Sequence, residues 1–199
     1  MSPKRKIITG PVTTAPAGII QQSDWRTEYT GYGSVNWSAA GVSFAPKQST
    51  QPSETHAALL LRNNTSLKDF TVKIKAKTVK QLRVNSPPNP WECFWFLFNY
   101  TIGADGKKTA NYLTLKPNGL EIGTMNAEIG QTFLYTAATP KLTLGVFNNF
   151  QITKAGASLS ASIDGDLAVV LSATGLYDQA GTFGIYSEDA EVLVESVVL

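Results

Sequence analysis

The chain has 199 residues, of which 43% are hydrophobic, 10% aromatic and 16% charged, with a formal net charge of +2. This length and apolar content suffice for one sizeable core, and a single all-β domain commonly reaches this size. The only cysteine, Cys93, excludes an intrachain disulfide, and the only histidine, His56, excludes a multi-histidine zinc site. No apolar run approaches the roughly 18 residues of a membrane-spanning helix.

The first 23 residues are rich in proline, threonine, glycine and alanine and show no periodicity. This composition predicts an extended or flexible N-terminal arm, followed by a single domain over residues 24–199. Residues 1–8 have the basic start of a signal peptide, but the residues after them are too polar and too rich in proline for its apolar region. We therefore expect an extracellular protein if a signal was removed or another export route is used, and a cytoplasmic one otherwise.

Short segments with strand periodicity, separated by turn residues, fill the rest of the chain. In residues 70–83 apolar residues alternate with Lys73, Lys75 and Lys77, which predicts a half-buried strand with a basic outer face. Further strands are predicted over residues 57–62, 91–100, 111–116, 120–124, 132–135, 147–154, 158–163, 167–171, 182–186 and 190–199. Helical periodicity is not sustained anywhere, so the sequence predicts an all-β fold of about a dozen short strands.

The aromatic segment WECFWFLFNY, residues 91–100, is the most informative of these strands. With a period of two, its phenylalanines share one face, typical of a core, whereas Trp91, Trp95 and Asn99 share the other. Tryptophans on an outward face favour stacking on a flat ligand such as a sugar ring. If the aliphatic residues of 111–116 face the core, Tyr112 and Lys116 join that outward face. A one-residue slip at a bulge would exchange the two faces.

Several blocks of the sequence carry a resemblance to a known superfamily, namely WECFWFLFNY, NYLTLKPNGLEIGT, QTFLYT and the ending GLYDQAGTFGIYSEDAEV. Over residues 25–199 the chain resembles jelly-roll domains of the concanavalin A-like superfamily, and within it glucuronan lyase-like polysaccharide lyases. The resemblance implies a jelly-roll β-sandwich of two curved antiparallel sheets with a concave face that holds an oligosaccharide. Enzymes and pure binding modules share this scaffold, so the fold does not settle the function.

The residues offer no acid pair for glycoside hydrolysis, because Glu92 points away from the tryptophan face and Glu121 is alone on its strand. A lyase acting on a uronic acid instead needs groups that neutralise a carboxylate and a group that transfers a proton. The catalytic candidates are Arg83, Gln81 and Asn99 for the carboxylate and Tyr112 for proton transfer, with Tyr135 and His56 in reserve. The candidates for holding an anionic chain are Trp91, Trp95, Lys73, Lys75, Lys77 and Lys116.

The resemblance also implies a structural calcium ion, since superfamily members often carry one, and Asp189 in the ending SEDA is the matching ligand. The alternative is that the acids of this ending are solvated turn residues. Three functions remain open: a lyase that cleaves an acidic polysaccharide by β-elimination, a non-catalytic carbohydrate-binding module, and an assembly protein that uses its N-terminal arm. A lyase requires Tyr112 close to Asn99, Gln81 or Arg83, whereas a binding module requires only the tryptophans.

Overall fold

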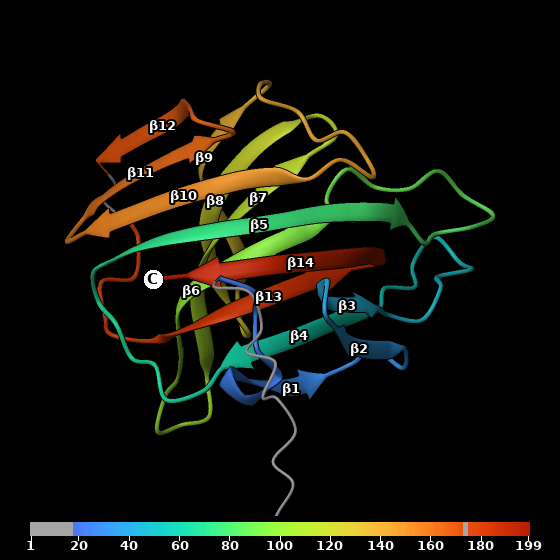
Figure 1. Cartoon of the computed structure of the whole chain (residues 1–199), viewed down its shortest axis with the longest axis horizontal. Helices are drawn as coiled ribbons and strands as arrows, with labels where there is room; N and C mark the ends of the chain where they lie inside the picture. The colour runs from blue at the N-terminus through green and yellow to red at the C-terminus, as the bar shows by residue number, and fades with distance from the viewer. Residues whose placement is uncertain (1–17, 173–174) are drawn as a thin grey trace, which may run out of the picture.

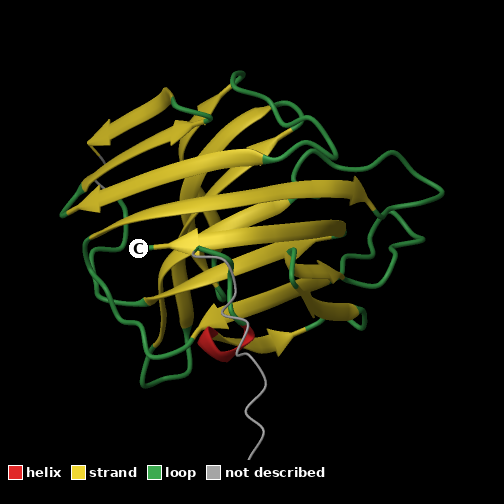
Figure 2. Cartoon of the chain, viewed as in Figure 1, coloured by secondary structure: helices red, strands yellow, loops and turns green. Residues whose placement is uncertain are grey.

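A computed structural model of the chain describes residues 18–172 and 175–199, and Figure 1 labels its strands. Figure 2 shows that nearly all regular structure is strand, apart from one short 3-10 helix. The elements are η1 Gln22–Asp24, β1 Trp25–Tyr29, β2 Ser34–Ser38, β3 Gly41–Ala45, β4 Ala57–Arg62, β5 Phe70–Gln81, β6 Phe94–Ile102, β7 Lys108–Lys116, β8 Gly119–Asn126, β9 Gly130–Ala137, β10 Asn148–Ala155, β11 Ser158–Ile163, β12 Asp166–Ser172, β13 Thr182–Glu188 and β14 Ala190–Val198. Each strand expected from periodicity is present. The strands 57–62 and 158–163 have the predicted ends, and each of the others is shifted at one or both ends.

The strands form two seven-stranded antiparallel sheets that pack face to face as a jelly-roll β-sandwich. Sheet A has the order β12-β11-β10-β5-β14-β3-β2, and sheet B has the order β1-β4-β13-β6-β7-β8-β9. In Figure 1, β10, β5 and β14 of sheet A cross the front of the molecule, and β6, β7 and β8 of sheet B run behind them. The predicted all-β sandwich is therefore confirmed.

The core lies between the sheets and is built from the apolar sides of strands that alternate. Phe70 of β5 lies 4.8 Å from Phe183 of β13, and Phe94 of β6 lies 5.8 Å from Phe150 of β10, measured between ring centroids. Both pairs join sheet A to sheet B. Burial of one such aromatic or aliphatic side chain contributes about 1.5–3 kcal/mol, so the matching periodicities of the two sheets stabilise their packing.

Strand β6 keeps its predicted alternation only as far as Phe98. Asn99 has φ 49°, in the left-handed region, and the register with β7 shifts between Phe98 and Thr101. As a result the Asn99 side chain turns into the interior, and Tyr100 moves to the face that Leu97 occupies. The prediction that Asn99 shares the tryptophan face is wrong, because a β-bulge inserts one residue at this point.

Only the last part of the predicted N-terminal arm belongs to the described residues. Ile19 forms an isolated bridge with Ser196, and the Ile20 amide donates to the Glu195 carbonyl at 3.0 Å. Ile20 is buried, so this part of the arm packs along β14. Residues 1–17, which the predicted arm also includes, lie outside the described residues. In the part of the chain that is described, no helix is long and apolar enough to cross a membrane.

Candidate functional site

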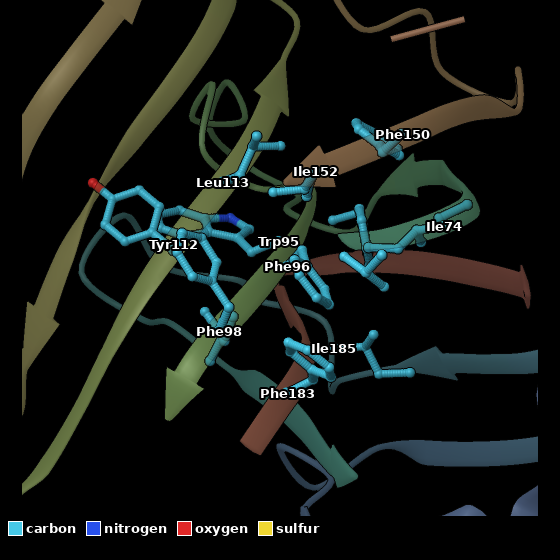
Figure 3. Packing of buried hydrophobic residues seen from close by; sticks show 14 of the residues in the cluster. Ile74, Trp95, Phe96, Phe98, Tyr112, Leu113, Phe150, Ile152, Phe183 and Ile185 are labelled. Atoms are coloured by element: carbon cyan, nitrogen blue, oxygen red, sulfur yellow. The ribbon is translucent and has the colours of Figure 1, made fainter. Parts of the chain in front are cut away.

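The outer face of sheet B carries an aromatic row that runs across its strands. Residues opposite one another in adjacent strands project to the same face. The register aligns Tyr29 of β1, Leu59 of β4, Tyr186 of β13, Trp95 of β6, Thr114 of β7 and Glu121 of β8. Figure 3 shows Trp95 and Tyr112 on the side of the sheet opposite Phe96 and Leu113. Trp95 and Tyr112 therefore share the outward face, as the sequence predicts, with ring centroids 4.8 Å apart.

Tyr112 is fully buried in this face and is held by a charged pair. Its hydroxyl donates to Glu121 Oε1 at 2.9 Å, while Lys116 Nζ contacts Glu121 Oε2. Burial, followed by the charge of Glu121, raises the pKa of Tyr112. Lys116 does share the face with Tyr112, as predicted. The arrangement keeps Tyr112 as a neutral hydrogen-bond donor, whereas a general base would have to give up its proton.

Glu188 supplies a carboxylate at the other side of Trp95. The Tyr186 hydroxyl donates to Glu188 Oε2 at 2.9 Å, and Tyr186 packs edge-on against Trp95 with centroids 5.8 Å apart. Burial, and then the charges of Asp189 and Glu92, raise the pKa of Glu188, although hydrogen bonds from Tyr186 and Trp91 oppose the rise. No lysine or arginine among residues 18–172 and 175–199 forms an ion pair with Glu188.

Trp91 lies just before the start of β6, where its side chain hydrogen-bonds the Glu188 carboxylate, and it is available to a ligand. Its side chain is 43% exposed, whereas Trp95 is only 1% exposed. The Trp95 indole N–H donates to the Trp91 carbonyl at 2.9 Å, which fixes the turn that carries Trp91. Of the two tryptophans that the sequence places on this face, only Trp91 presents a surface for stacking. Trp95 is buried against Tyr112 and Tyr186.

A hollow of about 350 Å³ opens on the same face. Buried Leu59 and Leu97 form its floor, and Tyr29, which is 40% exposed, stands at its side. The complete lining is Tyr29, Leu59, Leu97, Tyr100, Lys108, Thr109, Met125, Asn126, Ala127, Gly130, Gln131 and Tyr186. Burial raises the pKa of Tyr29 and of Tyr100 to about 12, so both phenols are neutral near pH 7. The hollow thus combines apolar rings with polar groups at its rim.

The predicted carboxylate-neutralising residue Arg83 lies elsewhere, in a buried ionic network. Its Nε donates to Glu92 Oε1 at 2.5 Å, and its Nη2 donates to Asp189 Oδ2 at 2.9 Å. The remaining guanidinium hydrogens reach the carbonyls of Gln51 and Glu54 at 2.7 and 2.9 Å. Arg83 is 7% exposed, so the structure commits this side chain to holding loops together.

Asp189, the predicted calcium ligand, belongs to the same network. Besides Arg83, its carboxylate accepts hydrogen bonds from the Ser49 hydroxyl at 2.5 Å and from the His56 backbone N–H at 2.8 Å. The residues present do not fit a calcium ion, because a guanidinium occupies one carboxylate oxygen and two donors occupy the other. Calcium binding at Asp189 therefore stays a prediction that this arrangement does not favour. In the two described ranges, no three His, Cys, Asp or Glu side chains cluster as metal ligands.

Ser49, His56 and Asp189 come together, but not in the order that nucleophilic catalysis requires. Ser49 Oγ lies 3.1 Å from His56 Nδ1 and also donates to Asp189, so the serine stands between the other two residues. In a catalytic triad the imidazole stands between the serine and the carboxylate. Ser49 is also fully buried, which leaves no path for a substrate to its hydroxyl.

The three lysines predicted to line the groove lie on the opposite side of the molecule. Lys73, Lys75 and Lys77 project from β5, whose other side carries the core residues Val72 and Ile74. Because β5 belongs to sheet A, its outward face points away from the outer face of sheet B. The expectation that this lysine strand borders Tyr112 is therefore wrong.

Gln81 and Asn99 are also separated from Tyr112. Gln81 ends β5 and donates to the Asn89 carbonyl at 2.8 Å. Asn99 Nδ2 donates to the carbonyls of Leu67 and Gln179, both at 2.9 Å, inside the molecule. The structure thus does not bring Arg83, Gln81 or Asn99 together with Tyr112, and the set proposed for β-elimination is dispersed over different parts of the fold.

The sequence reasoning missed Tyr29, Tyr186 and Glu188 as residues of this face. The signal was present in residues 182–188. With a period of two, Phe183 and Ile185 share one face of this strand, and Tyr186 and Glu188 share the other. Applying a period of two to this strand would have placed Tyr186 outside, opposite the core residues. Its position beside Trp95 depends on strand order, which the periodicity does not contain.

Comparison with known proteins gives a fold and no family. No protein-family model matches the chain, and no curated protein matches it. A carbohydrate-binding module, CBM66 from Bacillus subtilis, matches 87% of this chain and 93% of its own, with a TM-score of 0.64 and 14% identity. The fold is a concanavalin A-like jelly roll. At this level of identity the likeness concerns the fold alone.

Two further structures support the same architecture. A Bacillus subtilis protein of unknown function with a galectin-like fold has a TM-score of 0.62 and 12% identity, with 88% of each chain covered. A β-glucanase from Bacillus licheniformis has a TM-score of 0.57 and 10% identity, with 94% of each chain covered. The jelly roll predicted from the sequence blocks is thereby confirmed, although none of these structures is a lyase by its description.

Proposed function

We propose that this protein is a non-catalytic carbohydrate-binding module whose binding site is the outer face of sheet B. The carrying observation is that one face holds the exposed rings of Trp91 and Tyr29, the carboxylate of Glu188 and a hollow with an apolar floor. Tyr29 and Tyr186 line the hollow, and the Tyr186 hydroxyl connects it to Glu188. A sugar ring has an apolar C–H face that packs on aromatic rings and hydroxyl groups that need acceptors. The described function of CBM66, carbohydrate binding on the same fold, supports this assignment.

The charges of the site favour a neutral saccharide over the acidic polysaccharide expected from the sequence. Lys116 already pairs with Glu121, and Lys108 lies 3.4 Å from Glu28, so both cations have acidic partners. Glu188 has no such partner in the described chain and would repel a uronate carboxylate. A neutral sugar avoids this repulsion and can donate a hydroxyl hydrogen to Glu188.

Binding rather than cleavage is also the simpler consequence of where the acids lie. Glu121 is on β8 and Glu188 is on β13, with β6 and β7 between them, which places their strands about 14 Å apart at the usual strand spacing. Glycosidases hold their two carboxyl groups about 5–9.5 Å apart. Tyr112, the base expected for a lyase, donates its hydrogen to Glu121 and is fully buried.

The test is calorimetric titration of the whole protein with a panel of neutral glucans, mannans and fructans, together with glucuronan and alginate. We expect a neutral glycan to bind, and Trp91→Ala or Tyr29→Ala to weaken it about tenfold or more, as loss of a stacked aromatic ring does. Tyr32→Ala is the matched control, because Tyr32 is 89% exposed and does not line the hollow.

Two results would overturn the proposal. One is that no neutral glycan binds, or that binding of the neutral glycan is unaffected by both Trp91→Ala and Tyr29→Ala. The other is release of an unsaturated product from glucuronan or alginate, measured by the absorbance of that product. This result would restore the lyase hypothesis. In that case Tyr112→Phe should abolish product formation if Tyr112 is the base.

A further inference from the structure

The outer face of sheet A carries a line of cations that the proposed glycan site does not use. Lys73, Lys75 and Lys77 project outward from β5, the central strand of sheet A, at every second residue. In a strand this spacing places consecutive charges about 6.6 Å apart. In Figure 1 the strands β10, β5 and β14 face the viewer, so this face is the one shown at the front.

The positions of these ammonium groups are partly fixed by their neighbours. Lys75 Nζ lies 5.1 Å and Lys77 Nζ 4.6 Å from the centroid of the Phe147 ring, within the range of cation–π contacts. Lys75 also pairs with Glu195 at 2.9 Å, whereas neither Lys73 nor Lys77 takes part in an ion pair within the described residues. The line therefore has unneutralised positive charge on two of its three members.

Hydrogen-bond donors from neighbouring strands gather beside the lysines. Gln151 of β10 lies opposite Lys73 and also opposite Ser162 of β11, so these side chains form a polar row. A hollow of about 290 Å³ at this place is lined by Lys73, Ile74, Lys75, Asn149, Phe150, Gln151, Ser162, Gly165 and Ser196. No acidic residue belongs to that lining, although Lys75 and Asn149 donate to Glu195 and Asp164 next to it, both at 2.9 Å. The side chains of Lys73, Gln151 and Ser162 add further hydrogen-bond donors to the hollow.

We propose that this face is a second binding surface, which takes an anionic polysaccharide that bears carboxylate or sulfate groups. Charged ammonium groups and amide or hydroxyl donors form their strongest hydrogen bonds with anionic oxygens. Repeated anions along an extended chain match cations repeated along a strand. The surface is independent of the hollow on sheet B, because the two outward faces lie on opposite sides of the sandwich.

The probe is heparin, with alginate as its carboxylate counterpart, titrated into the whole protein at several sodium chloride concentrations. We expect both polymers to bind and the affinity to fall steeply with salt, as ion release from a polyanion requires. The double variant Lys73→Gln, Lys77→Gln should bind about tenfold more weakly. Lys107→Gln, Lys141→Gln is the control, which removes the same charge from two exposed lysines outside sheet A. Lys107 pairs with Asp105 and Glu128, so this control should change the affinity less than about twofold.

Three outcomes would overturn the inference. The polymers do not bind at low salt, both double variants lose affinity equally, or a single-stranded oligonucleotide of equal charge binds more tightly through the same lysines. Urea unfolding of Lys73→Gln, Lys77→Gln with an unchanged midpoint would show that the variant is folded. Failure of the neutral-glycan proposal leaves this test unaffected, because the two sites use different residues.

Discussion

At the scale of single residues, Glu188 differs from the other acids because it is largely buried without a cationic partner. Burial raises its pKa, so the protonated carboxyl is more favoured in the folded protein than in the unfolded chain. Its contribution to stability is present below the pKa of the unfolded chain and is lost as pH rises through the folded pKa. Near pH 7 the protein therefore carries the free-energy cost of a poorly solvated carboxylate.

We predict that the Glu188→Gln variant has a larger free energy of unfolding than the original protein near pH 7. Near pH 4 we expect the two proteins to be about equally stable, because the carboxyl group is then protonated. The amide can still accept the hydrogen bond from Tyr186, so only the charge changes. Urea unfolding at a series of pH values measures the difference in free energy between the two proteins. A variant that is less stable near pH 7 would mean that the carboxylate has a favourable partner in the folded state.

At the scale of the elements, the bulge in β6 depends on one asparagine. Asn99 Nδ2 reaches the carbonyls of Leu67, Lys68 and Gln179, and its Oδ1 accepts a hydrogen bond from Asn111 at 3.0 Å. Asn111 in turn exchanges hydrogen bonds with the backbone of Tyr177. The two amides thereby connect β6 and β7 to the loops before β5 and before β13, and asparagine tolerates the left-handed backbone better than most residues.

Asn99→Ala should lower the free energy of unfolding by about 2–4 kcal/mol, because several buried backbone acceptors lose their donor. Thermal and urea unfolding measure this loss. Asn118→Ala is the control, since Asn118 is exposed in the turn between β7 and β8 and should change stability by less than about 0.5 kcal/mol. If Asn99→Ala folds with unchanged stability, the interior amide network does not maintain the bulge.

At the scale of the whole molecule, Arg83 connects segments that are distant in the sequence. It binds Glu92 before β6, Asp189 between β13 and β14, and the carbonyls of Gln51 and Glu54 in the loop before β4. Each of these segments connects a strand of one sheet to a strand of the other. The guanidinium therefore holds the two sheets together at this end of the sandwich. Removing the guanidinium would leave the buried carboxylates of Glu92 and Asp189 without a compensating positive charge.

Arg83→Ala is therefore expected to cost about 3–5 kcal/mol of stability, measured by urea unfolding. Arg26→Ala, at a side chain that is 48% exposed, is the control and should cost less than about 1 kcal/mol. If Arg83 instead acted on a substrate, Arg83→Ala would fold with nearly unchanged stability and lose only activity. The stability measurement thus separates the structural role from the catalytic role expected from the sequence.

The sequence by itself determined the strands, the jelly roll and the face of each strand up to its first irregularity. Period-two alternation is local, so Lys73 and Val72 are assigned to opposite faces of β5 without knowledge of any neighbour. The same reasoning placed Trp95 and Tyr112 on one outward face, and their rings do pack together.

Only the tertiary structure decided which outward faces coincide and which polar residues are free to act. Sheet membership depends on pairings between segments far apart in the chain, so the alternation in β5 could not show that its lysines lie opposite the Trp95 face. The partners of Arg83 and Asn99 come from distant loops, and a bulge that moves one residue reverses the faces after it. Local periodicity carries no information on such contacts, because they form only when the two sheets close on each other.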